Sequence, residues 1–249
     1  MLWIRSAAFN LYLYVMTVLL AVGGAPAMLI SLNATFTVMR AWANLVNAGL
    51  RLICGIHVEI RGRNHLPSDS QVLVAAKHQS MWDTIIFISL LPKPVYVLKK
   101  ELSYIPFFGW YALRAGMISV DRDGHASALK QMVRDAKHCL AAGKTPVIFP
   151  EGSRAPAGGK LEYKPGIAAL YMQLHAPCVP VALNSGLFWP RRRFLRPPGT
   201  IVLEFLPPIE PGLRRREFME RLETSIEAAT GRLLAEAGKN GGNPARFPE

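Results

Sequence analysis

A histidine and an aspartate stand five positions apart in HQSMWD, from His78 to Asp83, directly after a short apolar run. On one regular helix their side chains would point about 140° apart. They can meet if His78 lies in a loop and Asp83 in the first turn of the following helix, where a carboxylate also suits the positive helix end. Asp83 would then fix the tautomer of His78 and leave its other ring nitrogen to accept a hydroxyl proton. The spacing alone is a weak motif and favours an ordinary loop histidine beside a helix acid.

A second segment, FPEGSR at 149–154, follows the apolar run TPVIFP and carries groups that suit a phosphate. Backbone N–H groups and a guanidinium are typical phosphate ligands, although a polar β-turn is the alternative interpretation. The residues concerned are Glu151, Gly152, Ser153 and Arg154. Another run, GMISVDR at 116–122, ends in Arg122. Arg122 and Arg154 can face one phosphate if their strands end at the same edge of a sheet.

The elements that must position these residues are short β-branched runs separated by helical stretches. Six runs predict buried strands, at 72–77, 95–100, 117–121, 145–150, 178–183 and 200–206. Apolar residues at helical spacing predict helices over about 126–142 and 214–237. Alternation of this kind is typical of an α/β fold with a mixed, mainly parallel sheet flanked by helices. We expect this domain to cover 59–238 and a disordered tail to cover 239–249.

The N-terminal part, residues 1–58, differs sharply in composition. Between Arg5 and Arg40 lie 34 residues without a charge, interrupted by Gly23, Gly24 and Pro26. We expect two apolar helices joined near 23–26, forming a membrane-associated hairpin that precedes the α/β domain. Each arm is short for a complete crossing, so a re-entrant or interfacial hairpin fits better than two full spans. A secretory signal peptide is the competing interpretation, but the apolar character continues beyond its cleavage pattern.

The amino-acid composition and net charge indicate which classes of partner the protein binds. The 249 residues carry a net charge of +12, are 51% hydrophobic and have a mean hydropathy of +0.19. A disordered chain is excluded, and anionic partners such as lipid headgroups, phosphorylated substrates or nucleic acid are favoured. Three cysteines and scattered histidines without ligand spacing predict neither a disulfide framework nor a metal site. A serine hydrolase is disfavoured because the chain contains no G-x-S-x-G motif.

The blocks HQSMWD, GMISVDR, FPEGSR and VPVAL, in this order and spacing, resemble the lysophospholipid acyltransferase family over roughly residues 60–210. The stretch KKELSYIPFFGW at 99–110 also looks like the one between the family's first two blocks. The combination is specific, whereas no single block is. The family's two-helix membrane anchor matches the broken apolar run at the N-terminus.

By this resemblance His78 is the general base and Asp83 its partner, while Arg122 and Arg154 bind the acceptor's phosphate. Glu151, Gly152 and Ser153 help to position its glycerol. Two residues depart from the family pattern: Lys77 replaces an asparagine and Ser153 a threonine. The serine keeps the hydroxyl, and the lysine is expected to affect the choice of donor or headgroup.

The resemblance implies transfer of an acyl chain from acyl-CoA or acyl carrier protein (ACP) to the sn-2 hydroxyl of 1-acyl-glycerol-3-phosphate, giving phosphatidic acid. It implies no cofactor, no metal and no nucleic acid, and a place at the bacterial inner membrane with the site facing the cytoplasm. Another lyso-lipid, such as lyso-ornithine lipid, is an alternative acceptor. A non-enzymatic basic protein that binds membranes or nucleic acid is a more distant alternative. The acyl donor, chain length and oligomeric state stay open.

Overall fold

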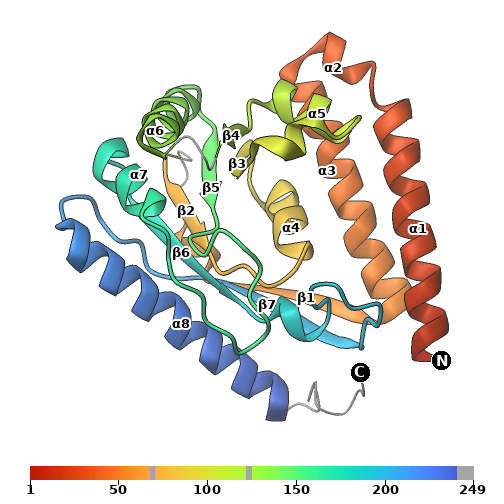
Figure 1. Cartoon of the computed structure of the whole chain (residues 1–249). Helices are drawn as coiled ribbons and strands as arrows, with labels where there is room; N and C mark the ends of the chain where they lie inside the picture. Colours follow the sequence, from red (N-terminus) through yellow and green to blue (C-terminus); the bar gives the residue numbers. More distant parts are fainter. Residues whose placement is uncertain (68–70, 122–124, 240–249) are drawn as a thin grey trace.

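A seven-stranded sheet forms the centre of the protein in this computed structural model, which describes residues 1–67, 71–121 and 125–239 (Figure 1). Of residue 125 only the backbone is described. The strands are β1 (Ile56–Arg61), β2 (Leu73–Ala76), β3 (Pro94–Lys99), β4 (Ile118–Val120), β5 (Thr145–Ile148), β6 (Cys178–Leu183) and β7 (Gly199–Phe205). The α-helices are α1 (Leu2–Gly23), α2 (Ala27–Ile30), α3 (Leu32–Gly49), α4 (Trp82–Leu90), α5 (Phe108–Ala115), α6 (His125–Ala141), α7 (Gly166–Leu174) and α8 (Arg215–Lys239).

The strand order is β1-β7-β6-β2-β5-β3-β4. Neighbouring strands from β6 to β4 are parallel, β7 is antiparallel to β6, and β1 is parallel to β7. The mixed, mainly parallel sheet predicted from sequence is therefore confirmed. Because β2, β4, β5 and β6 run in one direction, the segments that follow them emerge at the same edge, which is where open α/β sheets place their ligands.

Helices cover both faces of the sheet, and strand β2 shows why. All four of its residues are buried and apolar, as expected for a strand packed on two sides. Val74 and Ala76 belong to one core cluster together with residues of α1, α3 and α4, whereas Leu73 and Ala75 belong to a second cluster with residues of α6, α7 and α8. The N-terminal helices and the α6–α8 layer thus lie on opposite faces of the sheet (Figure 1).

Of the N-terminal helices, α1 and α3 form an antiparallel pair (Figure 1). The break expected near 23–26 is confirmed, because α1 ends at Gly23 and α2 begins at Ala27. The expected second helix is divided at Ser31, whose extended backbone separates α2 from α3. The Trp42 Nε1 atom of α3 donates to Thr17 Oγ1 of α1 at 3.0 Å. Among the described residues, α1 is the single helix long and apolar enough to cross a membrane by length and composition. Helix α3 is more polar than expected, and its Arg40 donates to the carbonyl of Pro92 at 2.7 Å.

Most predicted elements are found within one or two residues of their expected bounds. Strand β1 and helices α5 and α7 were not predicted. The C-terminal helix α8 includes Lys239, the first residue of the expected tail, and residues 240–249 lie outside the described part of the chain. Arg122 also lies outside it.

Candidate active site

His78 and Asp83 meet in the way their spacing requires. Strand β2 ends at Ala76 and α4 begins at Trp82, so His78 lies in the connecting loop and Asp83 in the first helical turn. His78 Nδ1 lies 3.0 Å from Asp83 Oδ2. A carboxylate only accepts hydrogen bonds, so Nδ1 carries a proton, and Nε2 is the acceptor nitrogen of the neutral imidazole. The His78 side chain is 13% exposed, whereas that of Asp83 is completely buried.

Asp83 is held by four hydrogen bonds, of which the His78 contact is one. Its Oδ2 also accepts from the backbone N–H groups of Gln79, at 2.7 Å, and Ser80, at 2.8 Å. Its Oδ1 accepts from the hydroxyl of Ser185 at 2.5 Å. Ser185 follows β6 at the same sheet edge and is itself fully buried. These four bonds, two of them from backbone N–H groups, fix the position and direction of the carboxylate.

The loop that follows β5 holds the main chain of His78 from two sides. The His78 N–H donates to Glu151 Oε2 at 3.2 Å, and the Ala155 N–H donates to the His78 carbonyl at 2.8 Å. The Phe149 ring stacks on the imidazole with centroids 4.1 Å apart. Two segments more than seventy residues apart in sequence thus form one unit around the imidazole.

The same loop presents the groups that suit an anion. Gly152 has φ +63°, a backbone conformation that side chains disfavour, and this permits the tight turn closed by its N–H bond to the Phe149 carbonyl. Arg191 donates to Ser153 Oγ and to the Arg154 carbonyl, both at 3.3 Å. Burial and the charge of Arg191 lower the pKa of the Arg154 guanidinium, while the charge of Asp83 opposes them. Arg154 thus belongs to the loop whose Ala155 N–H binds the His78 carbonyl.

Glu151 is tied to a buried lysine. Its Oε1 accepts from Lys77 Nζ at 2.6 Å, and both side chains are fully buried. The same ammonium donates to Glu227 Oε1 of α8 at 2.7 Å and to the Gly159 carbonyl at 3.2 Å. Glu227 also accepts from the Tyr163 hydroxyl at 3.0 Å. Burial raises the pKa of Glu151 above its ordinary value, although Lys77 opposes this shift.

These contacts change two expectations. Lys77 is buried, and its ammonium is enclosed by two carboxylates and a carbonyl. It is therefore not positioned to contact the acyl donor or the headgroup directly. Glu151 was expected against the acceptor's glycerol, yet it is 2% exposed and both oxygens accept from the protein. Sequence reasoning did not single out Ser185 or Glu227. The one available signal for Ser185 was its position just after the predicted strand at 178–183.

No group of three or more His, Cys, Asp or Glu side chains that could hold a metal ion occurs within residues 1–67, 71–121 and 126–239. The site consists of a base oriented by a carboxylate, next to a loop that turns at Gly152 and carries the Arg154 guanidinium. Such a site suits removal of a hydroxyl proton next to an anionic group.

Comparison with known proteins agrees with this chemistry. The family profile described as Acyltransferase matches residues 57–184, about half of the chain. A 1-acyl-sn-glycerol-3-phosphate acyltransferase of Pseudomonas aeruginosa is 32% identical over 199 residues, covering 80% of this chain and 77% of that protein. The alpha form of the mouse enzyme of that name is 30% identical, over 64% of this chain and 57% of its own length.

A solved structure shows the same fold. The crystal structure of the 1-acyl-sn-glycerophosphate acyltransferase of Thermotoga maritima matches with a TM-score of 0.80, covering 94% of this chain and 98% of the other, at 23% identity. The chain belongs to the acyltransferase family, and it is an enzyme that transfers acyl groups. The non-enzymatic alternative is thereby set aside.

Proposed function

We propose that the protein acylates the sn-2 hydroxyl of 1-acyl-glycerol-3-phosphate, giving phosphatidic acid for phospholipid synthesis. The observation that carries this proposal is the His78–Asp83 pair at 3.0 Å, next to the loop that bears Arg154 and binds the main chain of His78 through Glu151 and Ala155. The names of the Pseudomonas and mouse relatives support this acceptor. A phosphate held by a guanidinium would place the neighbouring glycerol hydroxyl near the imidazole.

In the proposed reaction, His78 Nε2 accepts the hydroxyl proton while the hydroxyl oxygen attacks the carbonyl carbon of the acyl thioester. The new C–O bond forms, the C–S bond breaks, and the imidazolium returns the proton to the departing thiolate. Asp83 stabilises the imidazolium through the Nδ1 contact. Gly152, Ser153 and Arg154 contact the acceptor in this proposal, as does Arg122. Glu151 acts indirectly, by holding the backbone of His78.

We further propose that the enzyme works at a lipid surface, at the cytoplasmic side of the inner membrane. Eight large apolar side chains of α1 are more than 40% exposed, a larger apolar surface than water-facing helices carry. They are Trp3, Ile4, Leu11, Tyr14, Val15, Val18, Leu19 and Val22. The acceptor would then reach the site from the bilayer, and the donor, acyl-CoA or acyl-ACP, from water.

To test this proposal, the full chain is purified in detergent and incubated with each of a panel of lyso-lipids and with labelled acyl-CoA or acyl-ACP. Product from 1-acyl-glycerol-3-phosphate, with less from phosphate-free acceptors, is the expected result. Product formed only from phosphate-free acceptors, such as lyso-ornithine lipid, would overturn both the acceptor and the role proposed for Arg154.

A further inference from the structure

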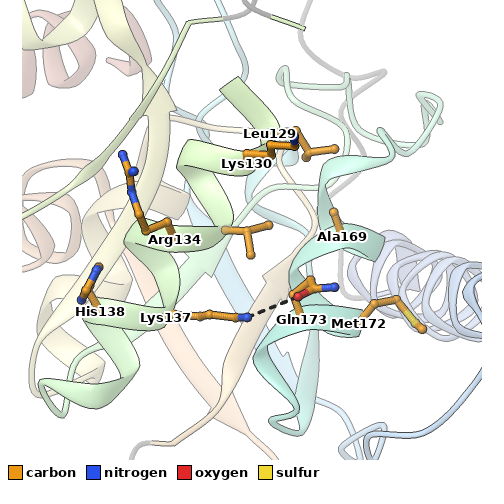
Figure 2. A pocket seen from close by; sticks show the side chains of 9 residues that line it. Leu129, Lys130, Arg134, Lys137, His138, Ala169, Met172 and Gln173 are labelled. Carbon is orange, nitrogen blue, oxygen red and sulfur yellow. Dashed lines mark hydrogen bonds between the residues drawn. The ribbon is translucent and has the colours of Figure 1, made fainter. Parts of the chain in front are cut away.

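A groove between α6 and α7 lies outside the site described above. It has a volume of about 710 Å³ and is lined by residues of these two helices only. Four side chains form its apolar part, namely Leu129, Val133, Ala169 and Met172, and Met172 is 40% exposed. Figure 2 shows Lys137 of α6 beside Gln173 of α7, where the lysine ammonium donates across the groove at 3.2 Å.

The rim of the groove on α6 is basic. Lys130, Arg134, Lys137 and His138 are exposed and recur on one side of the helix at intervals of four, three and one residues. They cover roughly 12 Å of the helix at 1.5 Å per residue. Among the nine lining residues there is no acidic side chain. The nearby Asp135 accepts from Gln131 and lies 4.0 Å from Arg134 Nε.

This combination fits one kind of occupant. An apolar floor bordered by the cations Lys130, Arg134 and Lys137, which extend over about two helical turns, is complementary to an amphipathic helix with acidic residues along its sides. An adenine nucleotide fits less well, because the floor offers aliphatic groups and a thioether and no aromatic ring for stacking. The occupant indicated by charge and shape is therefore an acidic helical protein.

The groove lies close to the sheet edge that holds His78, which indicates that the bound protein delivers the acyl donor. Helices α6 and α7 lie on the sheet face opposite α1, the helix that we place at the lipid surface (Figure 1). Both helices begin at the sheet edge that holds His78, since α6 follows β4 and α7 follows the Glu151 loop. Leu129 lies only about 6 Å along α6 from its start. A protein bound in this groove would lie on the side of the enzyme away from the lipid surface, next to the sheet edge that holds the active site.

We propose that the groove between α6 and α7 docks an acidic helix of the carrier protein that presents the acyl thioester. The inference rests on the proposed function and deepens it, because it assigns a place to the donor. It predicts that acyl-ACP is a substrate and that its use depends on the basic rim, whereas use of acyl-CoA does not.

The test compares acyl-ACP with acyl-CoA of the same chain length in a triple variant, Lys130→Glu with Arg134→Glu and Lys137→Glu. We expect kcat/KM for acyl-ACP to fall by at least about tenfold, mainly through KM, while that for acyl-CoA stays within about twofold of wild type. Added salt should lower the wild-type value for acyl-ACP toward that of the variant. The corresponding glutamine variants should give a smaller loss of the same selectivity.

A matched control reverses three exposed arginines of α8, through Arg215→Glu, Arg216→Glu and Arg221→Glu, for the same change in net charge. It should leave the use of both donors unchanged. Equal losses with both donors in the groove variant, or no loss with either, would overturn the docking proposal. So would a wild-type enzyme that uses acyl-CoA but not acyl-ACP. Absence of transfer from either donor to any lyso-lipid would instead refute the proposed function.

Discussion

Replacement of Lys77 by methionine tests whether the buried ion pair supports the His78 segment. Lys77→Met keeps the length of the side chain but leaves the fully buried Glu151 carboxylate without its cation. Loss of one partner from a buried pair costs about 3–5 kcal/mol. At roughly 2–4 °C per kcal/mol for a chain of this size, the unfolding midpoint should fall by about 6–20 °C. Glu227 is less affected, since its side chain is 22% exposed and can bind water.

Thermal unfolding in detergent, followed by circular dichroism, measures this shift. The double variant Lys77→Met with Glu151→Gln should recover most of the lost stability, because neither partner is then charged. Lys164→Met is the matched control: its pair with Glu162 is 2.9 Å long but 59% and 82% exposed, so the midpoint should not move. A single Lys77→Met variant that unfolds at the wild-type midpoint would refute the reasoning.

The same variant should show a defined dependence on pH. Burial raises the pKa of Glu151, so its contribution to stability is complete below the ordinary value and is lost as pH rises through the folded value. Lys77 opposes the rise, and its removal extends this window upward. The stability deficit of Lys77→Met should therefore shrink as pH is lowered, and Glu151→Gln should abolish this dependence. A deficit independent of pH would contradict the assignment to Glu151.

Ser185, Arg154 and the exposed face of α1 each give one further prediction. Ser185→Ala removes the donor to Asp83 Oδ1 and should lower kcat with little change in KM, measured in steady-state transfer; a changed KM alone would contradict the contact's proposed role. Arg154→Ala should weaken phosphate-bearing acceptors by about 10- to 100-fold in KM, from the roughly 1.5–3 kcal/mol of a charged hydrogen bond, and Arg154→Lys should recover part of this. Leu11→Asp with Val18→Asp should release the protein from lipid vesicles in flotation, because both side chains are exposed on α1; undiminished flotation would exclude this helix as the anchor.

The parts of the fold that sequence reasoning found are those with strong local signals. Continuous apolar runs predicted six of the strands, and Gly23 with Pro26 predicted the break after α1. Strand β1, IHVEIR, carries polar residues because only one of its residues is fully buried at the sheet edge, so its pattern was weak. Helix α7, GIAALYMQL, is a short apolar run that periodicity alone does not distinguish from a strand.

The site was predictable where it depends on a motif and not where it depends on long-range packing. His78 and Asp83 are five residues apart, so local geometry allowed their contact, and the family resemblance predicted it. Ser185 reaches Asp83 from 102 residues away, and Lys77 reaches Glu227 from 150 residues away. These contacts exist because β2, β5 and β6 are adjacent in the sheet and α8 packs against it. Strand order is not visible in any one segment.

The central claim is that His78 removes the proton of the acceptor hydroxyl. Its direct test is the turnover of His78→Ala with 1-acyl-glycerol-3-phosphate and a saturating acyl donor, in protein whose unfolding midpoint and vesicle binding match those of wild type. We predict that kcat falls by about 10²- to 10⁴-fold, as for loss of a general base. Wild-type turnover in that variant would contradict the account.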